Sequence, residues 1–255
     1  MGAELSAAYR PLPGLTISGV ARYPFVGTIA DATRTSNSVI QRVRSDSVLY
    51  AQQSELEINE LTAEYMFRPG KNLFGRTTVG YLEDMYAGVS GEVLWFPTDS
   101  RLALGVELNY VKQRNFDRLF GLQSYEVLTG HASAYYDFGN GFTTQLDVGR
   151  YLAGDYGATL SVDREFNNGF KVGAYATLTD VPFSSFGEGS FDKGIRISVP
   201  ISWLTGKPSR NQGTQVIQPV LRDGGARLNV NNRLYGQVRD YRSKKLSDGW
   251  GRFYR

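Results

Sequence analysis

The feature that most constrains this chain is an alternation of apolar and polar side chains with a period of two residues. It recurs along most of the first 203 residues. In 101–112 one face carries Leu102, Leu104, Val106, Leu108 and Tyr110, and the other carries Ala103, Gly105, Glu107 and Asn109. Such alternation is typical of a β-strand whose two faces meet different environments. It predicts eleven strands, near 3–10, 14–24, 52–68, 73–82, 88–96, 101–112, 124–138, 141–151, 155–166, 170–180 and 192–203.

The connections between these strands fall into two classes that alternate along the chain. Tight turns rich in Gly, Pro and Asn lie at 11–14, 69–72, 97–100, 139–141 and 167–169. Longer loops lie at 25–51, 113–123 and 181–191, with shorter connections on the same side at 83–87 and 152–154. Antiparallel strands place alternate connections at opposite ends of a sheet. Short turns at one end and longer loops at the other are typical of outer-membrane barrels.

Aromatic residues lie near the strand ends on the apolar face. They are Tyr23, Tyr81, Trp95, Tyr110, Phe138, Phe142, Tyr156, Phe166, Phe170 and Trp203. Such placement predicts two aromatic girdles at the membrane interfaces. We therefore predict an all-β, antiparallel, up-and-down transmembrane β-barrel over 1–203, with its apolar face toward lipid. The alternative is a soluble β-sandwich that binds carbohydrate and buries the apolar face in a core.

In strand 52–68 the apolar residues shift from even positions, Leu56 and Ile58, to odd positions, Leu61 and Ala63. In a regular strand this shift would move them to the opposite face. A β-bulge near residues 59–60 would restore the face. An odd count of eleven strands is also unusual, since single-chain bacterial barrels have even numbers. Either an upstream strand precedes Met1, which would give twelve or more strands, or the sequence contains one strand that the alternation does not identify.

The opposite face of the predicted strands carries charges of both signs. The candidate lumen residues are Arg22, Glu64, Arg68, Arg76, Glu92, Glu107, His131, Asp147, Asp163, Glu165, Lys171 and Arg196. Mixed charge suits a hydrated interior that a polar polymer could cross. The alternative is that these ions pair across the barrel and fill it, because side chains decide how much channel a barrel of this size retains.

None of these patterns makes a strong catalytic or metal site. Glu92 and Glu107 face inward on neighbouring strands, and two carboxylates at the right spacing could hydrolyse a glycoside. His131 and Ser133 share one strand face but are side by side, about 7 Å apart, rather than in nucleophile–base geometry. The stretch 206–209 lacks the glycine spacing of a phosphate loop, and the chain has no Cys. We predict no catalytic residues, no metal and no cofactor.

The C-terminal part differs in charge from the rest. Residues 204–255 carry 11 Lys and Arg against 3 Asp and Glu, a net of +8, which leaves −5 for residues 1–203. We predict a basic periplasmic tail, in which 214–221 could pair with 226–235 and 236–247 could form a short helix. Nucleic-acid binding is not predicted because no recognised module is present. Candidate contacts to a partner are Arg239, Arg242, Lys244, Lys245, Trp250 and Phe253. The alternative is that the tail packs under the mouth of the barrel.

Several short motifs resemble one known family. They are GYLEDMYAG at 80–88 followed by EVL at 92–94, EGSFDKG at 188–194, ISWLTGKP at 201–208, LRDGG at 221–225 and the terminal WGRF at 250–253. These segments resemble the C-terminal half of the YjbH family, outer-membrane proteins encoded with exopolysaccharide and capsule export genes. The resemblance covers most of residues 60–255.

The resemblance implies a Gram-negative outer-membrane barrel of a lipoprotein family that helps a polysaccharide leave the cell. The implied partners are the polymer, a periplasmic or outer-membrane polysaccharide-export lipoprotein, and outer-membrane lipids. The tail would lie in the periplasm. A closed assembly barrel that contacts the exporter without conducting is the alternative within the membrane class. Neither reading requires an enzyme.

Overall fold

A computed structural model describes residues 2–25, 31, 36–185, 191–206, 212–218 and 223–242. Twelve strands form one antiparallel sheet in which each strand pairs with its neighbours in the sequence. They are β1 (Gly2–Leu12), β2 (Leu15–Pro24), β3 (Glu57–Gly70), β4 (Leu73–Tyr81), β5 (Tyr86–Trp95), β6 (Leu102–Arg114), β7 (Leu122–Asp137), β8 (Phe142–Arg150), β9 (Tyr156–Glu165), β10 (Lys171–Thr179), β11 (Asp192–Pro200) and β12 (Gln212–Ile217). Short helices are α1 (Ser47–Gln53), η2 (Phe183–Ser185), α2 (Ile201–Thr205) and α3 (Leu234–Asp240).

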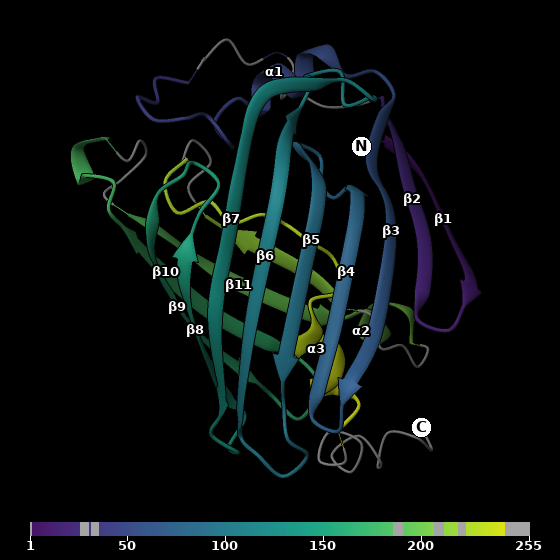
Figure 1. Ribbon diagram of the computed structural model, residues 1–255, viewed down its shortest axis with the longest axis vertical. Helices are drawn as coiled ribbons and strands as arrows, with labels where there is room; N and C mark the ends of the chain where they lie inside the picture. The colour runs from purple at the N-terminus through teal and green to yellow at the C-terminus, as the bar shows by residue number, and fades with distance from the viewer. Residues whose placement is uncertain are drawn as a thin grey trace.

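The sheet curls strongly, so that β3–β7 lie in front of β8–β11 with an interior between them (Figure 1). Hydrogen bonds among the described residues join every consecutive pair from β1 to β12 but do not join β12 to β1. The sheet is therefore an open, curled meander. It is one sheet and not the two packed sheets of a sandwich. Among the described residues, no helix is long and apolar enough to cross a membrane.

All eleven predicted strands are present, but two of their ends were wrong, because residues 52–53 belong to α1 and residues 201–203 belong to α2. The predicted strand count was also one short. The missed strand is β12, which pairs with β11. Its sequence contains only two apolar residues, Val216 and Ile217, after a glycine and three polar residues. We expected 214–221 to pair with 226–235. Instead, residues 212–217 extend the sheet, and helix α3 occupies the end of the expected second strand.

The predicted bulge in β3 is confirmed. Val20 pairs with Glu60 and Ala21 pairs with Ile58, so Asn59 is the extra residue. A second departure from regular geometry lies between β4 and β5, where Gly80 and Gly88 are paired and have φ of 131° and 155°. A Cβ on Gly80 would lie 2.1 Å from the carbonyl oxygen of Leu61. Glycines allow this close backbone approach where the sheet curves.

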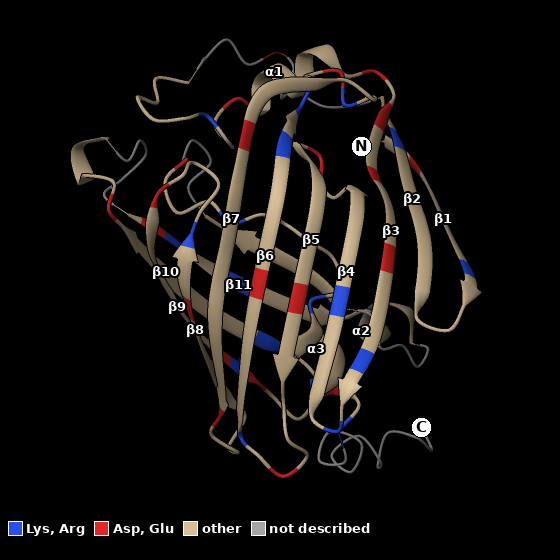
Figure 2. Ribbon diagram, in the orientation of Figure 1, with Lys and Arg blue, Asp and Glu red and all other residues tan. Residues whose placement is uncertain are grey.

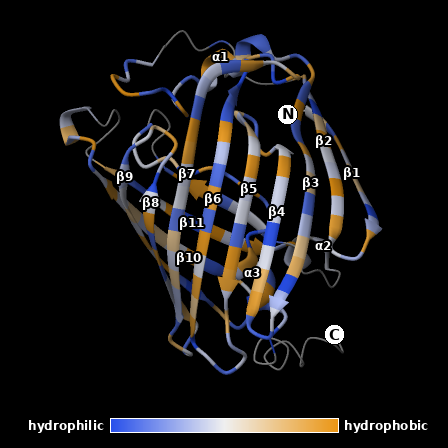
Figure 3. Ribbon diagram, viewed as in Figure 1, coloured by the Kyte–Doolittle hydropathy of each residue, from blue (hydrophilic) through white to orange (hydrophobic). Residues whose placement is uncertain are grey.

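The exposure of the two faces is the reverse of that in a soluble protein: apolar side chains are exposed and charged side chains are buried. On β6, Leu104, Val106 and Leu108 are 44%, 53% and 59% exposed, whereas Glu107 between them is 2% exposed. The alternation is visible along β3–β7 (Figure 3). Along β3–β7 the apolar face is convex and bare, and the polar face is concave and covered, whereas β1 is exposed on both faces.

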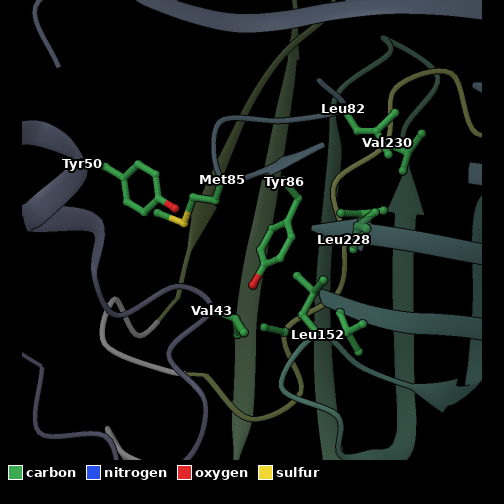
Figure 4. Close-up of a cluster of buried hydrophobic side chains, with 11 residues drawn as sticks. Val43, Tyr50, Leu82, Met85, Tyr86, Leu152, Leu228 and Val230 are labelled. Carbon is green, nitrogen blue, oxygen red and sulfur yellow. The ribbon is translucent and has the colours of Figure 1, made fainter. Parts of the chain in front are cut away.

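Two apolar clusters nevertheless lie inside the curled sheet. The larger one is at the end with the long loops and joins Val43 and Tyr50 to Tyr86, Leu152 and Leu228 (Figure 4). The smaller one, near the tight turns, joins Leu94, Phe96, Ala103 and Tyr135 to Leu234. Both clusters are completed by residues from 223–242.

Residues 223–242, which we name the interior segment, lie in the space enclosed by the curled sheet and extend from one end of it to the other. Leu152 N–H donates to the carbonyl of Ala226 at the long-loop end. At the opposite end, the guanidinium of Arg242 donates to the carbonyls of Pro97 and Ser100 in a tight turn. Helix α3 lies between these two ends (Figure 1). The interior segment therefore fills part of the interior.

Candidate functional site: the interior and the segment that fills it

A row of charges crosses the middle of β3–β6 on the concave face (Figure 2). Arg76 on β4 pairs in register with Glu92 on β5, which in turn is opposite Glu107 on β6. The Arg76 guanidinium is fully buried and lies 3.1 Å from Glu92 Oε2 and 3.5 Å from Glu107 Oε2. Two carboxylates directly opposite each other would repel. Arg76 offsets this repulsion.

The interior segment supplies further cations to these carboxylates. Arg233 donates from Nε and Nη2 to the two oxygens of Glu107, at 2.7 and 3.1 Å. Arg227 lies 2.9 Å from Asp147 Oδ1 and 3.6 Å from Glu107 Oε1. Burial alone would lower the pKa of Arg227, but Glu107 and Asp147 raise it above its ordinary value. Arg227 therefore remains charged, and the segment is held by paired ions.

Helix α3 is positioned by a backbone contact and by aromatic stacking. The N–H of Leu234, at the start of α3, donates to the carboxylate of Glu92 at 3.1 Å. The Tyr235 ring stacks on Tyr135 with ring centroids 3.9 Å apart and a 10° interplanar angle. It also contacts Phe96, at 5.5 Å. An anion at a helix start and a stacked ring pair both favour this placement.

At the tight-turn end, cations of the interior segment contact the sheet rim. Arg239 Nη2 donates to Glu165 Oε2 at 2.7 Å. The Arg242 guanidinium also donates to the carbonyl of Thr98, and it lies 3.9 Å from the centre of the Phe96 ring. Arg239 and Arg242, predicted to contact a partner, thus make contacts within the chain. The other candidates, Lys244, Lys245, Trp250 and Phe253, lie outside the described residues.

At the long-loop end, two carboxylates hold the start of the interior segment. Asp223 accepts hydrogen bonds from the backbone N–H groups of Val43, Arg44 and Ser45 at 2.8, 2.8 and 3.0 Å. Asp155 Oδ2 accepts one from the N–H of Gly225 at 2.8 Å. Burial raises the pKa of Asp155, and this hydrogen bond offsets part of the rise.

The other charged residues predicted for the lumen contact one another or the interior segment, with two exceptions. Glu64 accepts from Asn232, Arg196 donates to Asp163, and Lys171 lies 3.9 Å from Glu165. Arg22 instead pairs with Glu57 on β3, and Arg68 is exposed at a strand end and donates to turn carbonyls. The geometry brings most of the predicted set together on one face.

His131 and Ser133 do not form a hydrogen-bonded pair. Ser133 donates to Asp147 at 2.5 Å rather than to His131. The His131 ring packs edge-on against Tyr151, with centroids 4.7 Å apart. Both ring nitrogens lack a hydrogen-bond partner among the described residues. No cluster of three or more potential metal ligands occurs in the part of the chain that the structure describes.

The predicted girdle residues divide between the two sheet ends. At the long-loop end are Tyr23, Tyr81, Tyr110 and Tyr156; at the tight-turn end are Trp95, Phe138, Phe142, Phe166, Phe170 and Trp203. All ten are at least partly exposed. At the tight-turn end, Phe170 stacks on Trp203 at 6.2 Å and contacts Phe166 at 5.8 Å.

Sequence reasoning missed the residues that organise the interior. Arg227, Arg233 and Tyr235 were not among the candidates, and their role depends on contacts that span 80 to 126 residues of sequence. One signal was present: a basic C-terminal part beside an acidic remainder. Opposite net charges are consistent with the two parts packing together.

Comparison with known proteins agrees with the resemblance seen in the motifs. The YjbH family, described as exopolysaccharide biosynthesis protein YbjH, matches residues 1–240. The "uncharacterized lipoprotein YjbH" of Escherichia coli (strain K12) is 38% identical over 209 residues. That alignment covers 80% of this chain but 30% of the E. coli protein, so the chain spans less than a third of that relative. No solved structure matches the chain significantly. The chain belongs to the YjbH family of exopolysaccharide biosynthesis proteins.

Proposed function

We propose that this chain forms an outer-membrane β-barrel with a partly filled lumen, which serves exopolysaccharide export without enzymatic activity. One observation carries the proposal: the apolar face of the sheet is bare while its charged face is covered. Contiguous apolar surface on this scale is costly in water. In a bilayer, the same surface contacts lipid tails.

Closure of the sheet is part of the proposal. Unpaired backbone groups at the edges of β1 and β12 would cost several kcal/mol each in hydrocarbon. The two edges must therefore be satisfied in the membrane. We propose that β1 and β12 approach each other there and complete the barrel.

The interior contacts support a stabilising role for the buried carboxylates. Glu92 and Glu107 are each held by cations or backbone donors and are covered by the interior segment. A glycosidase needs one protonated and one free carboxylate beside its substrate. We therefore assign both residues to holding the interior segment.

The partners are proposed from the family and from the location. A polysaccharide would be the cargo, and a periplasmic or outer-membrane polysaccharide-export lipoprotein would meet the barrel at its tight-turn end. The E. coli relative is named a lipoprotein, which supports a place in the cell envelope. The tight turns would face the periplasm, as in other barrels.

The test is to delete the gene from a strain that makes exopolysaccharide and to restore it with the full-length protein. We expect the protein to fractionate with the outer membrane and to migrate differently on gels with and without heating. We expect export of polymer to fall on deletion and to return on complementation. Fractionation with soluble proteins, or export that is unaffected by deletion, would contradict the proposal.

A further inference from the structure

Two cavities lie along the interior segment, one after the other. The first, of about 1090 Å³, extends from the long-loop end between the interior segment and the wall made by β8–β12. The second, of about 1190 Å³, lies at the tight-turn end beneath Arg239 and Arg242. Tyr235 is the residue that lines both. Each volume lies just above the range of about 300–1,000 Å³ for small-molecule sites.

The wall of the first cavity is rich in hydroxyl and amide groups. It includes Thr159, Ser161, Tyr175 and Gln145 from the sheet and Asn229 from the interior segment. Neighbouring hydroxyls are hydrogen-bonded, as between Thr159 and Thr177 at 2.8 Å. Hydroxyls and amides can both donate and accept hydrogen bonds. The charged side chains in the same lining include pairs such as Arg227 with Asp147. The hydroxyl and amide groups between them match a ligand that carries many hydroxyl groups.

The junction between the cavities combines an aromatic ring with an ion pair. Tyr235 is half-buried and fixed by its stacking on Tyr135. Glu165 and Arg239 line the second cavity beside it and pair at 2.7 Å. The Nε of Arg239 has no hydrogen-bond partner among the described residues. An apolar ring face next to charged donors and acceptors suits a sugar ring, which has apolar C–H surfaces and polar edges.

We propose that a saccharide chain binds along the interior segment in these two cavities and contacts Tyr235 where they meet. The inference rests on the proposed function and adds the path of the saccharide and the residue that it contacts. The saccharide passes beside the interior segment, which stays in place. Each sugar unit moves past Tyr235 and the Arg239–Glu165 pair.

The test uses thiol labelling, because the chain has no Cys of its own. Single cysteines replace Asn229 in the first cavity and Thr98 in the second, with Leu119→Cys on a loop outside both as the control. The full-length protein is labelled in detergent with a water-soluble maleimide. Labelling is done with and without oligosaccharides cut from the producing strain's exopolysaccharide, and with dextran fragments of the same size.

We expect either saccharide to slow labelling at both cavity positions and to leave the control unchanged. Tyr235→Ala should weaken the protection about threefold to tenfold, as expected for loss of one aromatic contact, and Tyr235→Phe should retain it. Labelling that neither saccharide slows, or protection that Tyr235→Ala leaves intact, would overturn the inference. Failure of the proposed function is distinguishable, because it would appear as wrong fractionation or as unaffected export.

Discussion

Arg233 of the interior segment forms a two-pronged ion pair with Glu107 of β6, 126 residues earlier in the sequence. Glu107 also lies within 3.6 Å of the guanidinium groups of Arg76 and Arg227. One buried carboxylate thus joins β4, β6 and the interior segment. The paired charges of the interior are the main polar contacts that hold residues 223–242 inside the sheet.

Replacing Glu107 by Gln should loosen the interior segment. Removal of one partner from a buried ion pair typically costs about 3–5 kcal/mol, because the remaining charges stay desolvated. Trypsin should then cleave after Arg227 and Arg233 much faster, because cleavage reports how often the segment opens. Glu126→Gln is the matched control, since Glu126 is exposed and pairs with a partly exposed Lys112. Its effect should be about 0–1 kcal/mol. Equal cleavage of the two variants would contradict this role.

The sheet was predictable from sequence and the interior segment was not. Strands such as β6 alternate strictly, so their existence and their two faces follow from local pattern alone. The bulge at Asn59 followed from a change of parity. The Asp-Gly-Gly sequence at 223–225 has the composition of a hairpin turn, yet Asp223 binds the backbone of 43–45 instead. That partner is about 180 residues away, so no local pattern identifies it.

A charge on the convex face should block membrane assembly. Val106→Arg places a cation at the centre of β6, where a charge facing lipid costs about 2–4 kcal/mol. We expect loss of the heat-modifiable form and of outer-membrane fractionation. Leu119→Arg in the loop after β6 is the control and should assemble normally. Normal assembly of both variants would count against lipid contact at β6.

Burial of Asp155, whose carboxylate accepts a hydrogen bond from the N–H of Gly225, should make the docking of the interior segment depend on pH. Burial raises the pKa of Asp155 above its ordinary 3.8. A raised pKa means that the folded state favours the protonated acid. The stability from this group is therefore fully present below pH 3.8 and is lost as pH rises through the raised value. Asp155→Asn, which stays neutral, should flatten this part of the pH dependence.

The test is to measure unfolding or tryptic cleavage of the wild-type protein and of Asp155→Asn from pH 4 to 7. The wild-type protein should lose stability across this range relative to Asp155→Asn. Asp46 also has a pKa raised by burial, so Asp46→Asn serves as the second variant. Parallel pH profiles for the wild type and Asp155→Asn would exclude the proposed contribution.

Closure of the barrel should bring the first and last strands together. Ser6 on β1 and Thr214 on β12 both lie on the concave side, as judged from their pairing with Val20 and Ser198. A protein carrying Ser6→Cys and Thr214→Cys should form an intramolecular cross-link with a short bifunctional thiol reagent in membranes. Each single variant controls for links between molecules. Absence of the cross-link in a correctly assembled protein would mean that other strands satisfy these edges.

The most direct test of the account is site-directed spin labelling of the full-length protein in bilayers. Spin labels are placed at Leu104, Val106, Leu108 and Asn229. Contact with oxygen, which concentrates in lipid, reports exposure to the bilayer, and contact with a water-soluble nickel chelate reports exposure to water. The account predicts oxygen contact at the three β6 positions, greatest toward the bilayer centre, and nickel contact at Asn229 in the interior cavity. Nickel contact on the apolar face of β6, or oxygen contact at Asn229, would contradict it.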